Sequence, residues 1–252
     1  MSHYKIAELF GCSFSTITNR LKEHEIPLKT PAYARTKYPK KDFSGDLEEK
    51  SYILGFRLGD LNCYRASEKS ETIVARCHTT EKVQVTLIEG LFSSYGKVTI
   101  SKNKGHYHIN CLLNNSFHFL LTKKFSPKNL HQLSFIAGYF DAEGNSQLNQ
   151  GRARIKIDSY DIDILRWISN SLTLSGFENK LWKIGNRGDK RTDGTYFNND
   201  LWRITLNKAL VIKKFIEAIS PYMKHKKQII NMNKCLENIE ERIEKGSIYA
   251  AR

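Results

Sequence analysis

The strongest constraint on the fold is a helix-like sequence pattern that occurs twice, 83 residues apart, and ends each time in an acidic residue. The first copy occupies residues 51–60 and the second occupies residues 134–144. The four matched pairs are Ser51 with Ser134, Gly55 with Gly138, Gly59 with Ala142, and Asp60 with Glu143. Internal repetition at a fixed offset predicts two similar halves that pack on each other.

The small residues of each copy are spaced four apart, so in a helix they lie on one face. A glycine inside a helix costs about 0.5–1 kcal/mol relative to alanine, so Gly55 and Gly138 need a packing reason. We expect the two small-residue stripes to face each other, because small residues let two helix backbones approach closely.

This packing places Asp60 and Glu143 at the C-terminal ends of two adjacent helices. The negative end of a helix dipole disfavours a carboxylate, and a second carboxylate nearby raises both pKa values or requires a cation. Oxygen ligands of this kind suit Mg²⁺, which leaves its other positions to water and phosphate. Two unrelated capped helices would not match at four positions, so the pattern predicts a divalent metal site. Asp141 is a weaker candidate, because its counterpart is Leu58.

The second copy resembles the nine-residue motif of the LAGLIDADG homing endonucleases. Residues 136–144 match this motif closely and residues 53–61 match it more loosely, with Leu58 and Leu61 replacing its earlier acid and its final glycine. The similarity covers roughly residues 47–230. It implies a Mg²⁺ site, with Mn²⁺ or Ca²⁺ able to replace Mg²⁺ for binding. The metal-site residues that it implies are Asp60, Glu143, Gly59 and Ala142.

A similar run of strands and helices is predicted after each acid. In the first half the predicted strands are 72–79, 97–103 and 106–113, with a helix over 81–95. In the second half they are 152–159, 180–185 and 201–207, with a helix over 161–175 and a polar loop over 186–200. The predicted fold is α+β, a pseudo-twofold monomer of two αββαββα repeats with antiparallel sheets. The family resemblance implies the saddle-shaped sheets of the homing endonuclease fold.

The charge of the chain favours a polyanionic partner. Lysine and arginine number 40 against 26 aspartates and glutamates, a net charge of +14, and phosphate neutralisation supplies most nonspecific nucleic-acid affinity. No apolar run approaches a membrane span, and the first residues lack the apolar core of a signal peptide. The five cysteines are odd in number and show no CxxC spacing. We therefore expect a cytoplasmic protein, or one of an organellar matrix or nucleoid, that is neither secreted nor membrane-bound.

Basic and hydrogen-bonding residues alternate with apolar residues along the predicted strands. Polar faces of antiparallel sheets are often merely solvated, but these faces carry few acids, as readout of a DNA groove requires. The resemblance likewise implies sheets that straddle the major groove of double-stranded DNA. The strand residues that we expect to contact DNA are Arg76, His78, Lys97, Thr99, Ser101, Arg152, Arg154, Lys156, Lys183, Arg203 and Thr205.

Residues 1–26 predict a helical hairpin. A short helix over 5–10 meets a turn at Gly11, and Ser13 can cap a second helix that extends to about Glu25. The expected apolar seam consists of Ile6, Leu9, Phe10, Ile17 and Leu21. The hairpin resembles a helix-turn-helix whose second helix would present Asn19 and Arg20 to a major groove. Because the usual supporting helix is absent, a hairpin that simply packs on the main domain stays an alternative.

The remaining boundaries follow from composition and periodicity. Residues 27–46 hold three of the five prolines and several basic residues, which predicts an extended linker. The first half is predicted over 47–129 and the second over 130–228, with a C-terminal helix and tail over 229–252. Apolar residues of that helix recur every three or four positions, so we expect it to pack against the body. They are Ile229, Met232, Leu236, Ile239 and Ile243.

Lys226 lies in a segment that reads Pro-Tyr-Met-Lys-His-Lys-Lys-Gln over residues 221–228. In related enzymes a lysine after a similar string reaches the active site, and Lys226 matches it best. A lysine there would orient water or stabilise the charge that grows on phosphate.

These features predict a metal-dependent endonuclease that acts as a monomer, with Asp60, Glu143 and Lys226 as its catalytic residues. Since the halves differ, its DNA site should be long and only partly palindromic, and family kinship implies staggered cutting at an intron-insertion site. Two alternatives are a DNA-binding transcription regulator without catalysis, favoured by the helix-turn-helix, and an RNA-splicing maturase that binds intron RNA. The acid pair favours the nuclease, because a pure binder gains nothing from two anions beside DNA.

Overall fold

The computed structural model describes residues 3–26, 28, 38–122 and 125–248 of the chain, which divides into two compact units, Met1–Pro39 and Lys40–Arg252. The larger unit begins earlier than expected, because residues 40–46 of the predicted linker pack on it. The backbone N–H of Lys41 donates to the carbonyl of Tyr95 at 2.8 Å, and the N–H of Phe43 donates to Ser116 Oγ at 2.8 Å. Linker residues 27 and 29–37 lie outside the described residues.

The smaller unit consists of helices α1 (His3–Leu9) and α2 (Phe14–Glu23). Gly11 adopts a φ of +59° in the turn between them, and Ser13 Oγ accepts a hydrogen bond from the N–H of Thr16 at the start of α2. The expected apolar seam is wrong for Leu9 and Phe10, which are 69% and 74% exposed. Two short helices offer too little surface to cover both sides of such a hairpin.

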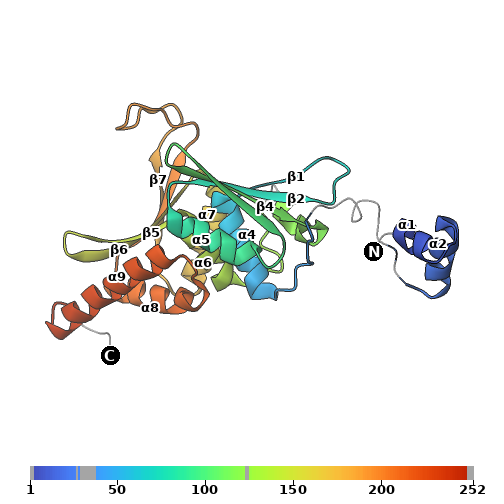
Figure 1. The fold of residues 1–252 in the computed structure, drawn as a ribbon. Coiled ribbons are helices and arrows are strands. Elements are labelled where there is room, and N and C mark those ends of the chain that lie inside the picture. Colours follow the sequence, from blue (N-terminus) through green and yellow to red (C-terminus); the bar gives the residue numbers. More distant parts are fainter. Residues whose placement is uncertain (1–2, 27, 29–37, 123–124, 249–252) are drawn as a thin grey trace. The chain divides into compact units, whose positions relative to one another are not determined.

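The larger unit contains two successive runs of similar elements (Figure 1). The first run comprises α4 (Leu47–Asp60), β1 (Asn62–Arg65), β2 (Ile73–Thr79), α5 (Lys82–Phe92), β3 (Lys97–Asn103), β4 (His106–Leu113) and the 3₁₀ helix η1 (Asn115–Leu121). The second comprises α6 (Gln132–Glu143), β5 (Gly144–Asn149), β6 (Arg152–Ser159), α7 (Ile162–Leu174), β7 (Lys180–Gly185), β8 (Leu201–Leu206) and α8 (Ala209–Ile219). The 3₁₀ helix η2 (Ser220–Tyr222) and α9 (Lys226–Glu244) follow. The first run thus ends in a 3₁₀ helix where an α-helix was expected.

Each run forms one antiparallel sheet, and the strand order is the same in both. The first sheet has the order β1-β2-β4-β3 and the second has the order β5-β6-β8-β7. Alternate residues of the central strands are buried beneath the sheets, as Ala75 and Cys77 are in β2 and Ile155 and Ile157 are in β6. The predicted α+β fold of two repeats with antiparallel sheets is therefore confirmed.

The core is centred on α4 and α6, and α9 closes the second half. Tyr52, Phe56, Phe135 and Tyr139 are at most 1% exposed, and these aromatic side chains bury much of the apolar surface of the helix pair. Helix α9 lies against β5, β6 and α8 and buries Met232, Cys235 and Ile239, so its expected packing on the body is confirmed. Within the described part of the chain, no helix has both the length and the apolar character needed to cross a membrane.

Candidate active site and nucleic-acid interface

Helices α4 and α6 touch through their backbones at the two matched glycines. A Cβ atom added to Gly55 would lie 2.2 Å from the carbonyl oxygen of Phe135, and one added to Gly138 would lie 2.1 Å from that of Tyr52. A side chain fits at neither position, because both obstacles are backbone atoms. The expectation that the small-residue stripes face each other is confirmed.

The matched serines join the N-terminal ends of the same two helices. The backbone N–H of His131 donates to Ser51 Oγ at 2.8 Å, and Ser134 Oγ donates to the carbonyl of Glu48 at 2.5 Å. His131 and Glu48 are themselves related by the 83-residue offset. The two serine hydrogen bonds thus join equivalent positions of the two halves, and they fix the register of α4 against α6.

The C-terminal ends of α4 and α6 bring the two predicted acids together. A Cβ atom added to Gly59 would lie 2.4 Å from Ala142 Cβ and 3.0 Å from Glu143 Cγ, so the last turn of α4 abuts that of α6. Asp60 is the last residue of α4, and Glu143 is the last residue of α6. The acids therefore end two adjoining helices at pseudo-equivalent positions.

The pKa values of both carboxyl groups are raised. Burial raises the pKa of Asp60 to about 7, although Gln84 Nε2 donates to Asp60 Oδ2 at 2.5 Å and opposes the shift. Burial also raises the pKa of Glu143 to about 7, and the charges of Asp60 and Asp158 add to the effect. A nearby cation would relieve this penalty, because it stabilises the ionised carboxylates.

The donor set fits a hard divalent cation such as Mg²⁺. Carboxylate oxygens are its preferred protein ligands, and one or two of them suffice when water and phosphate supply the rest. Among the described residues there is no group of three or more His, Cys, Asp and Glu side chains placed to hold a metal ion. The carboxylate pair would thus leave most of the coordination shell to other ligands. Gly59 and Ala142 bring the acids together, and their roles as ligands stay predictions.

Asp141 has a structural position that the sequence did not reveal. Its side chain is 3% exposed, and Oδ2 accepts hydrogen bonds from Tyr52 Oη at 2.5 Å and from the backbone N–H groups of Lys224 and His225 at 2.8 and 2.9 Å. Burial raises the pKa of Asp141, and these three hydrogen bonds oppose the shift. Asp141 thus fixes the segment that leads into α9 against the central helices.

The start of α9 lies close to the acid pair through Gln228. Its Nε2 donates to the carbonyl of Gly144 at 2.6 Å, directly after Glu143. Lys227 Nζ pairs with Glu81 Oε1 at 2.9 Å, which links the second half to the first. The predicted catalytic lysine, Lys226, is exposed at the first residue of α9, and its side chain makes no hydrogen bond or ion pair with another described residue.

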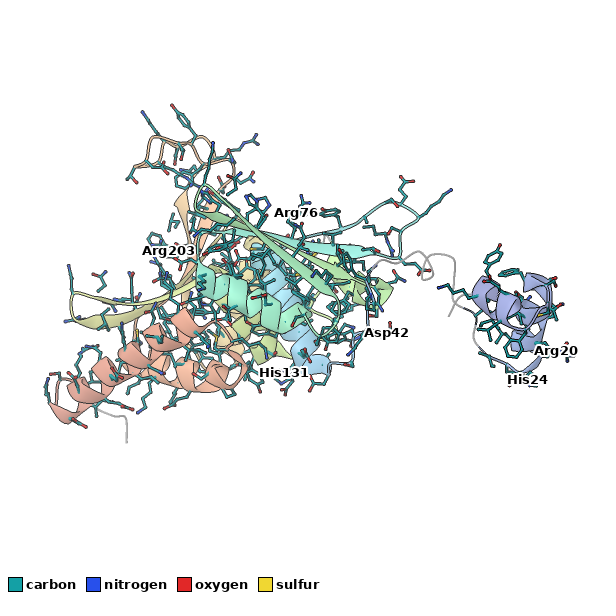
Figure 2. The ribbon with its side chains drawn as sticks, in the orientation of Figure 1. Arg20, His24, Asp42, Arg76, His131 and Arg203 are labelled. Carbon is teal, nitrogen blue, oxygen red and sulfur yellow. The ribbon has the colours of Figure 1, made fainter. Side chains whose placement is uncertain are left out.

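The polar face of the first sheet carries the strand residues that we expected to contact DNA from the alternation of polar and apolar positions. The register places Arg76 opposite Asn110 and His78 opposite His108, while Thr99 and Ser101 of β3 lie opposite the same two β4 residues. Lys97 shares this face, because it is two residues before Thr99. Arg76 Nε donates to Asn110 Oδ1 at 2.9 Å. Figure 2 shows Arg76 on this sheet.

The second sheet has a similar face, with one acid that the sequence reasoning did not weigh. Arg152, Arg154 and Lys156 alternate with buried residues of β6, and Lys156 lies opposite Thr205. Asp158 continues this row and binds Arg203, labelled in Figure 2, through two hydrogen bonds of 2.6 Å. The ion pair neutralises Asp158 and fixes the guanidinium.

Lys183 does not share the face of Arg203. Its register partner is Trp202, whereas Arg203 lies opposite Trp182, so Lys183 points to the other side of the second sheet. Its ammonium pairs with Asp200 at 3.0 Å and lies over the Trp202 ring. Lys183 therefore lies apart from the row of Arg203 and Thr205, and its contact with DNA stays a prediction.

In the smaller unit, Asn19 and Arg20 are exposed on α2. Arg20 pairs with Glu23 at 2.9 Å on the same helix. A pair this exposed contributes little stability, so it leaves the guanidinium accessible to a ligand.

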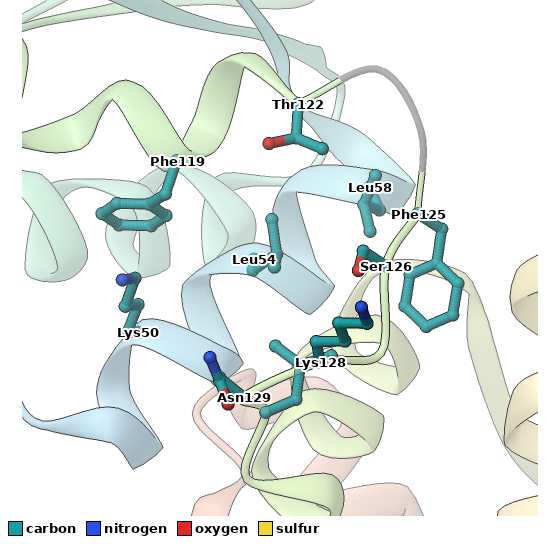
Figure 3. A pocket seen from close by; sticks show the side chains of 10 residues that line it. Lys50, Leu54, Leu58, Phe119, Thr122, Phe125, Ser126, Lys128 and Asn129 are labelled. Atoms are coloured by element: carbon teal, nitrogen blue, oxygen red, sulfur yellow. The ribbon is translucent and has the colours of Figure 1, made fainter.

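A pocket of about 250 Å³ lies beside α4 on the side of Leu58, the counterpart of Asp141 (Figure 3). Leu54, Leu58, Phe119 and Phe125 give the pocket apolar walls. Here the first half has an apolar surface where the second half has a buried carboxylate.

Comparisons with known proteins agree with this geometry. Residues 131–220 match the family model of the LAGLIDADG-like domain. No curated protein sequence matches the chain. The solved structure of the homing endonuclease I-WcaI bound to its DNA recognition sequence is similar with a TM-score of 0.53 at 13% identity, over 74% of this chain and 86% of that chain.

Two further solved structures align at lower scores. One is I-DmoI in complex with DNA and Mn, with a TM-score of 0.47 at 18% identity, over 71% of this chain and 98% of that chain. The other is full-length DUF199/WhiA from Thermatoga maritima, with a TM-score of 0.48 at 17% identity, over 80% of this chain and 63% of that chain.

The chain therefore has the LAGLIDADG homing endonuclease fold, with two antiparallel four-stranded sheets. Its second half carries the LAGLIDADG-like domain over residues 131–220. The resemblance of residues 136–144 to the LAGLIDADG motif is therefore confirmed.

Proposed function

We propose that the larger unit is a site-specific endonuclease that hydrolyses both strands of a long, partly palindromic DNA duplex with divalent metal. The observation that carries this proposal is the junction of α4 and α6. There the pKa values of Asp60 and Glu143 are each raised to about 7, at pseudo-equivalent ends of touching helices. Two acids whose ionisation is disfavoured, placed at a twofold position, are well suited to hydrolysis of two antiparallel strands. In a protein that only binds DNA, their negative charges would weaken the affinity for DNA.

The residues around the acids support a hydrolytic site. Asp60 and Glu143 would hold Mg²⁺, or Mn²⁺ in its place, and the ion would lower the pKa of a bound water and stabilise the leaving oxygen. Gln84 restrains the Asp60 carboxylate, and Gln228 holds the backbone directly after Glu143. Lys226 is free to swing toward a phosphate and stabilise its developing charge.

The two polar sheet faces are the proposed DNA-binding surface. Their arginine and lysine side chains would neutralise phosphates, and their hydroxyl, amide and imidazole groups would read base edges in the major groove. The similar fold of I-WcaI, which is described as bound to its DNA recognition sequence, supports this placement. The halves carry different residues at equivalent strand positions, so the two half-sites would differ. We propose that the protein acts as a monomer in intron homing, with Asn19 and Arg20 of α2 as an added DNA contact.

Selection of cleaved duplexes from a randomised library in Mg²⁺ tests the proposal directly. Wild-type protein should release a defined class of long sites cut on both strands. Asp60→Asn and Glu143→Gln should each reduce cleavage of the selected site at least about 100-fold, because each removes a ligand charge. Both variants should still bind that site in Ca²⁺. Asp163→Asn removes one acid from a side chain on α7 that is 80% exposed, and it should cleave at the wild-type rate.

The alternatives give different results in this assay and in an assay of RNA splicing. A transcription regulator would bind a selected duplex tightly in both Ca²⁺ and Mg²⁺ and would never cut it. A maturase would accelerate splicing of an intron RNA, and the acid substitutions would leave that activity intact. Either result would overturn the proposal that the protein is an endonuclease.

A further inference from the structure

The connections between paired strands differ between the two halves. The first sheet joins β3 to β4 through Lys104 and Gly105 alone, whose φ angles of +47° and +84° are typical of a tight hairpin turn. The second sheet joins β7 to β8 through residues 186–200. The second half therefore has an added loop where the first half has a minimal turn.

The 186–200 loop is folded on itself by a set of backbone hydrogen bonds. The N–H of Arg191 donates to the carbonyl of Thr195 at 2.7 Å, and that of Phe197 donates to the carbonyl of Asp189 at 3.0 Å. The Phe197 ring rests on Gly185, where an added Cβ atom would lie 2.9 Å from it. A loop held in this way has already lost much of the conformational entropy that ligand binding would otherwise cost.

A cavity of about 590 Å³ separates this loop from Glu143. Glu143, Asp158 and Tyr160 line the side that belongs to the body, and Lys190, Arg191 and Phe197 line the side that belongs to the loop. The volume lies within the range of sites that hold small organic ligands, and a nucleotide unit of a DNA strand is a ligand of this size.

Arg191 is oriented by two aromatic rings. Its guanidinium carbon lies 4.5 Å from the Phe197 ring centroid and 5.9 Å from that of Tyr160, and Nη2 donates to Tyr160 Oη. Nε is buried and has no hydrogen-bond partner among the described residues. A guanidinium stacked on rings keeps its planar set of N–H donors, which matches the oxygens of a phosphate.

The acids around Arg191 are occupied elsewhere. Asp193 Oδ1 accepts hydrogen bonds from the backbone N–H and the hydroxyl of Thr195 at 3.0 and 2.6 Å, and Asp158 binds Arg203. Arg191 makes no ion pair within 4.0 Å of a described carboxylate, although its charge contributes to the lowered pKa of Asp193, which lines the same cavity. The cavity therefore presents a guanidinium without a close carboxylate partner on one wall and the Glu143 carboxylate on another, an arrangement that suits a phosphate beside Arg191.

We propose that Arg191 binds one backbone phosphate of a single DNA strand next to Glu143, so that the two strands of the site are held unequally. The proposal rests on the proposed DNA-binding function and specifies how the second half engages its strand. Tyr160 and Phe197 are positioning residues for the guanidinium. The tight Lys104–Gly105 turn provides no comparable clamp in the first half.

The contact is tested by removing the charge of one DNA phosphate at a time and measuring the affinity of the protein for each duplex, without cleavage. Duplexes of the selected site, each with one methylphosphonate in place of a phosphate, are titrated in Ca²⁺ against wild-type protein, Arg191→Ala and Arg187→Ala. One substitution near the cleavage position of one strand should weaken wild-type binding about tenfold or more, as expected for a lost charge-assisted hydrogen bond. Arg191→Ala should lose sensitivity at that phosphate alone. Arg187→Ala removes the same charge from the same loop outside the cavity, and it should keep the wild-type pattern.

Strand-labelled cleavage in Mg²⁺ supplies the second measurement. Arg191→Ala should slow nicking of the strand that carries the sensitive phosphate by about tenfold relative to the other strand, and Arg191→Lys should restore part of the rate. An unchanged methylphosphonate pattern in Arg191→Ala would overturn the phosphate contact while leaving DNA binding intact. If wild-type protein binds no duplex, the DNA-binding function itself fails and this proposal fails with it.

Discussion

The two halves hold the chain that follows their last helix in different ways. In the second half, Asp141 accepts hydrogen bonds from the backbone of Lys224 and His225 and from Tyr52. In the first half its counterpart, Leu58, lines the apolar pocket of Figure 3 together with Phe125. The Phe125 ring packs on Phe135 with a centroid distance of 5.3 Å.

This difference is a paired exchange of polar for apolar groups. Tyr52 and Phe135 are related by the 83-residue offset, as are Leu58 and Asp141. Asp141 of the second half is therefore paired with Tyr52 of the first half, whereas the equivalent positions hold Leu58 in the first half and Phe135 in the second. Both halves keep the glycine contact and the terminal acids. The residues at the Leu58 and Asp141 positions and at the Tyr52 and Phe135 positions differ together.

Substitution of the shared glycines should have the largest effect on stability, and the effect should be nearly equal in the two halves. Gly55→Ala and Gly138→Ala each push a Cβ atom to within 2.2 Å of a carbonyl oxygen. Overpacking against backbone should lower the free energy of unfolding by at least about 3 kcal/mol, as measured by urea denaturation. Gly90→Ala in α5 is the matched control, because an added Cβ atom meets nothing within 4 Å there. It should raise stability slightly, since alanine favours the helix. Tolerance of alanine at either crossing glycine would contradict direct backbone contact.

Substitutions at the Asp141 and Leu58 positions should have unequal effects. Asp141→Leu leaves the buried N–H of His225, the partly buried N–H of Lys224 and the Tyr52 hydroxyl without an acceptor, so the free energy of unfolding should fall by about 2 kcal/mol. Leu58→Ala should cost about 1 kcal/mol, because the leucine is only partly buried beside a pocket. A double-mutant cycle with Tyr52→Phe measures the coupling. Equal losses at the two positions, or no coupling between Asp141 and Tyr52, would show that the hydrogen bonds to Asp141 are not a distinct feature of the second half.

The acid pair should make the stability of the metal-free protein depend on pH in a defined way. The ordinary pKa values are 3.8 for Asp60 and 4.5 for Glu143, and both rise to about 7 in the folded protein. Between pH 4 and 7 the folded state binds more protons at these groups than the unfolded chain does. This contribution to stability is complete below pH 4 and is lost as pH rises through 7. In metal-free protein the free energy of unfolding should fall by several kcal/mol across this range, because one unit of pKa shift corresponds to about 1.4 kcal/mol.

Variants distinguish the contributions of Asp60 and Glu143 to the pH dependence of stability. Asp60→Asn and Glu143→Gln should each flatten the fall of stability with pH. Gln84→Ala should steepen it, because Gln84 donates a hydrogen bond to the Asp60 carboxylate. Addition of Mg²⁺ should raise the melting temperature more at pH 8 than at pH 5, since the ionised acids bind the cation. Identical pH profiles for wild type and both acid variants would argue against raised pKa values.

The repeated motif predicted the central helices, the adjoining acids and most strands, because small-residue spacing and alternation are local patterns. Strands β1 and β5 were not located, since their sequences NCYR and GNSQLN contain little of the β-branched and aromatic character that marks a strand. The roles of Gln84, Asp141 and Gln228 depend on partners 24, 83 and 84 positions away. Arg191 lies in a polar loop whose folding depends on Phe197 and Gly185, so composition alone did not distinguish it.

The bare backbone contact at Gly55 and Gly138 has a consequence for how such a protein can change. No side chain separates α4 from α6 at that point, so the spacing of the terminal acids depends on main-chain geometry and not on the identity of neighbouring residues. The outer strands can therefore acquire new residues without shifting Asp60 and Glu143 relative to each other. The proposed DNA-binding faces and the proposed metal site can therefore diverge independently within one chain.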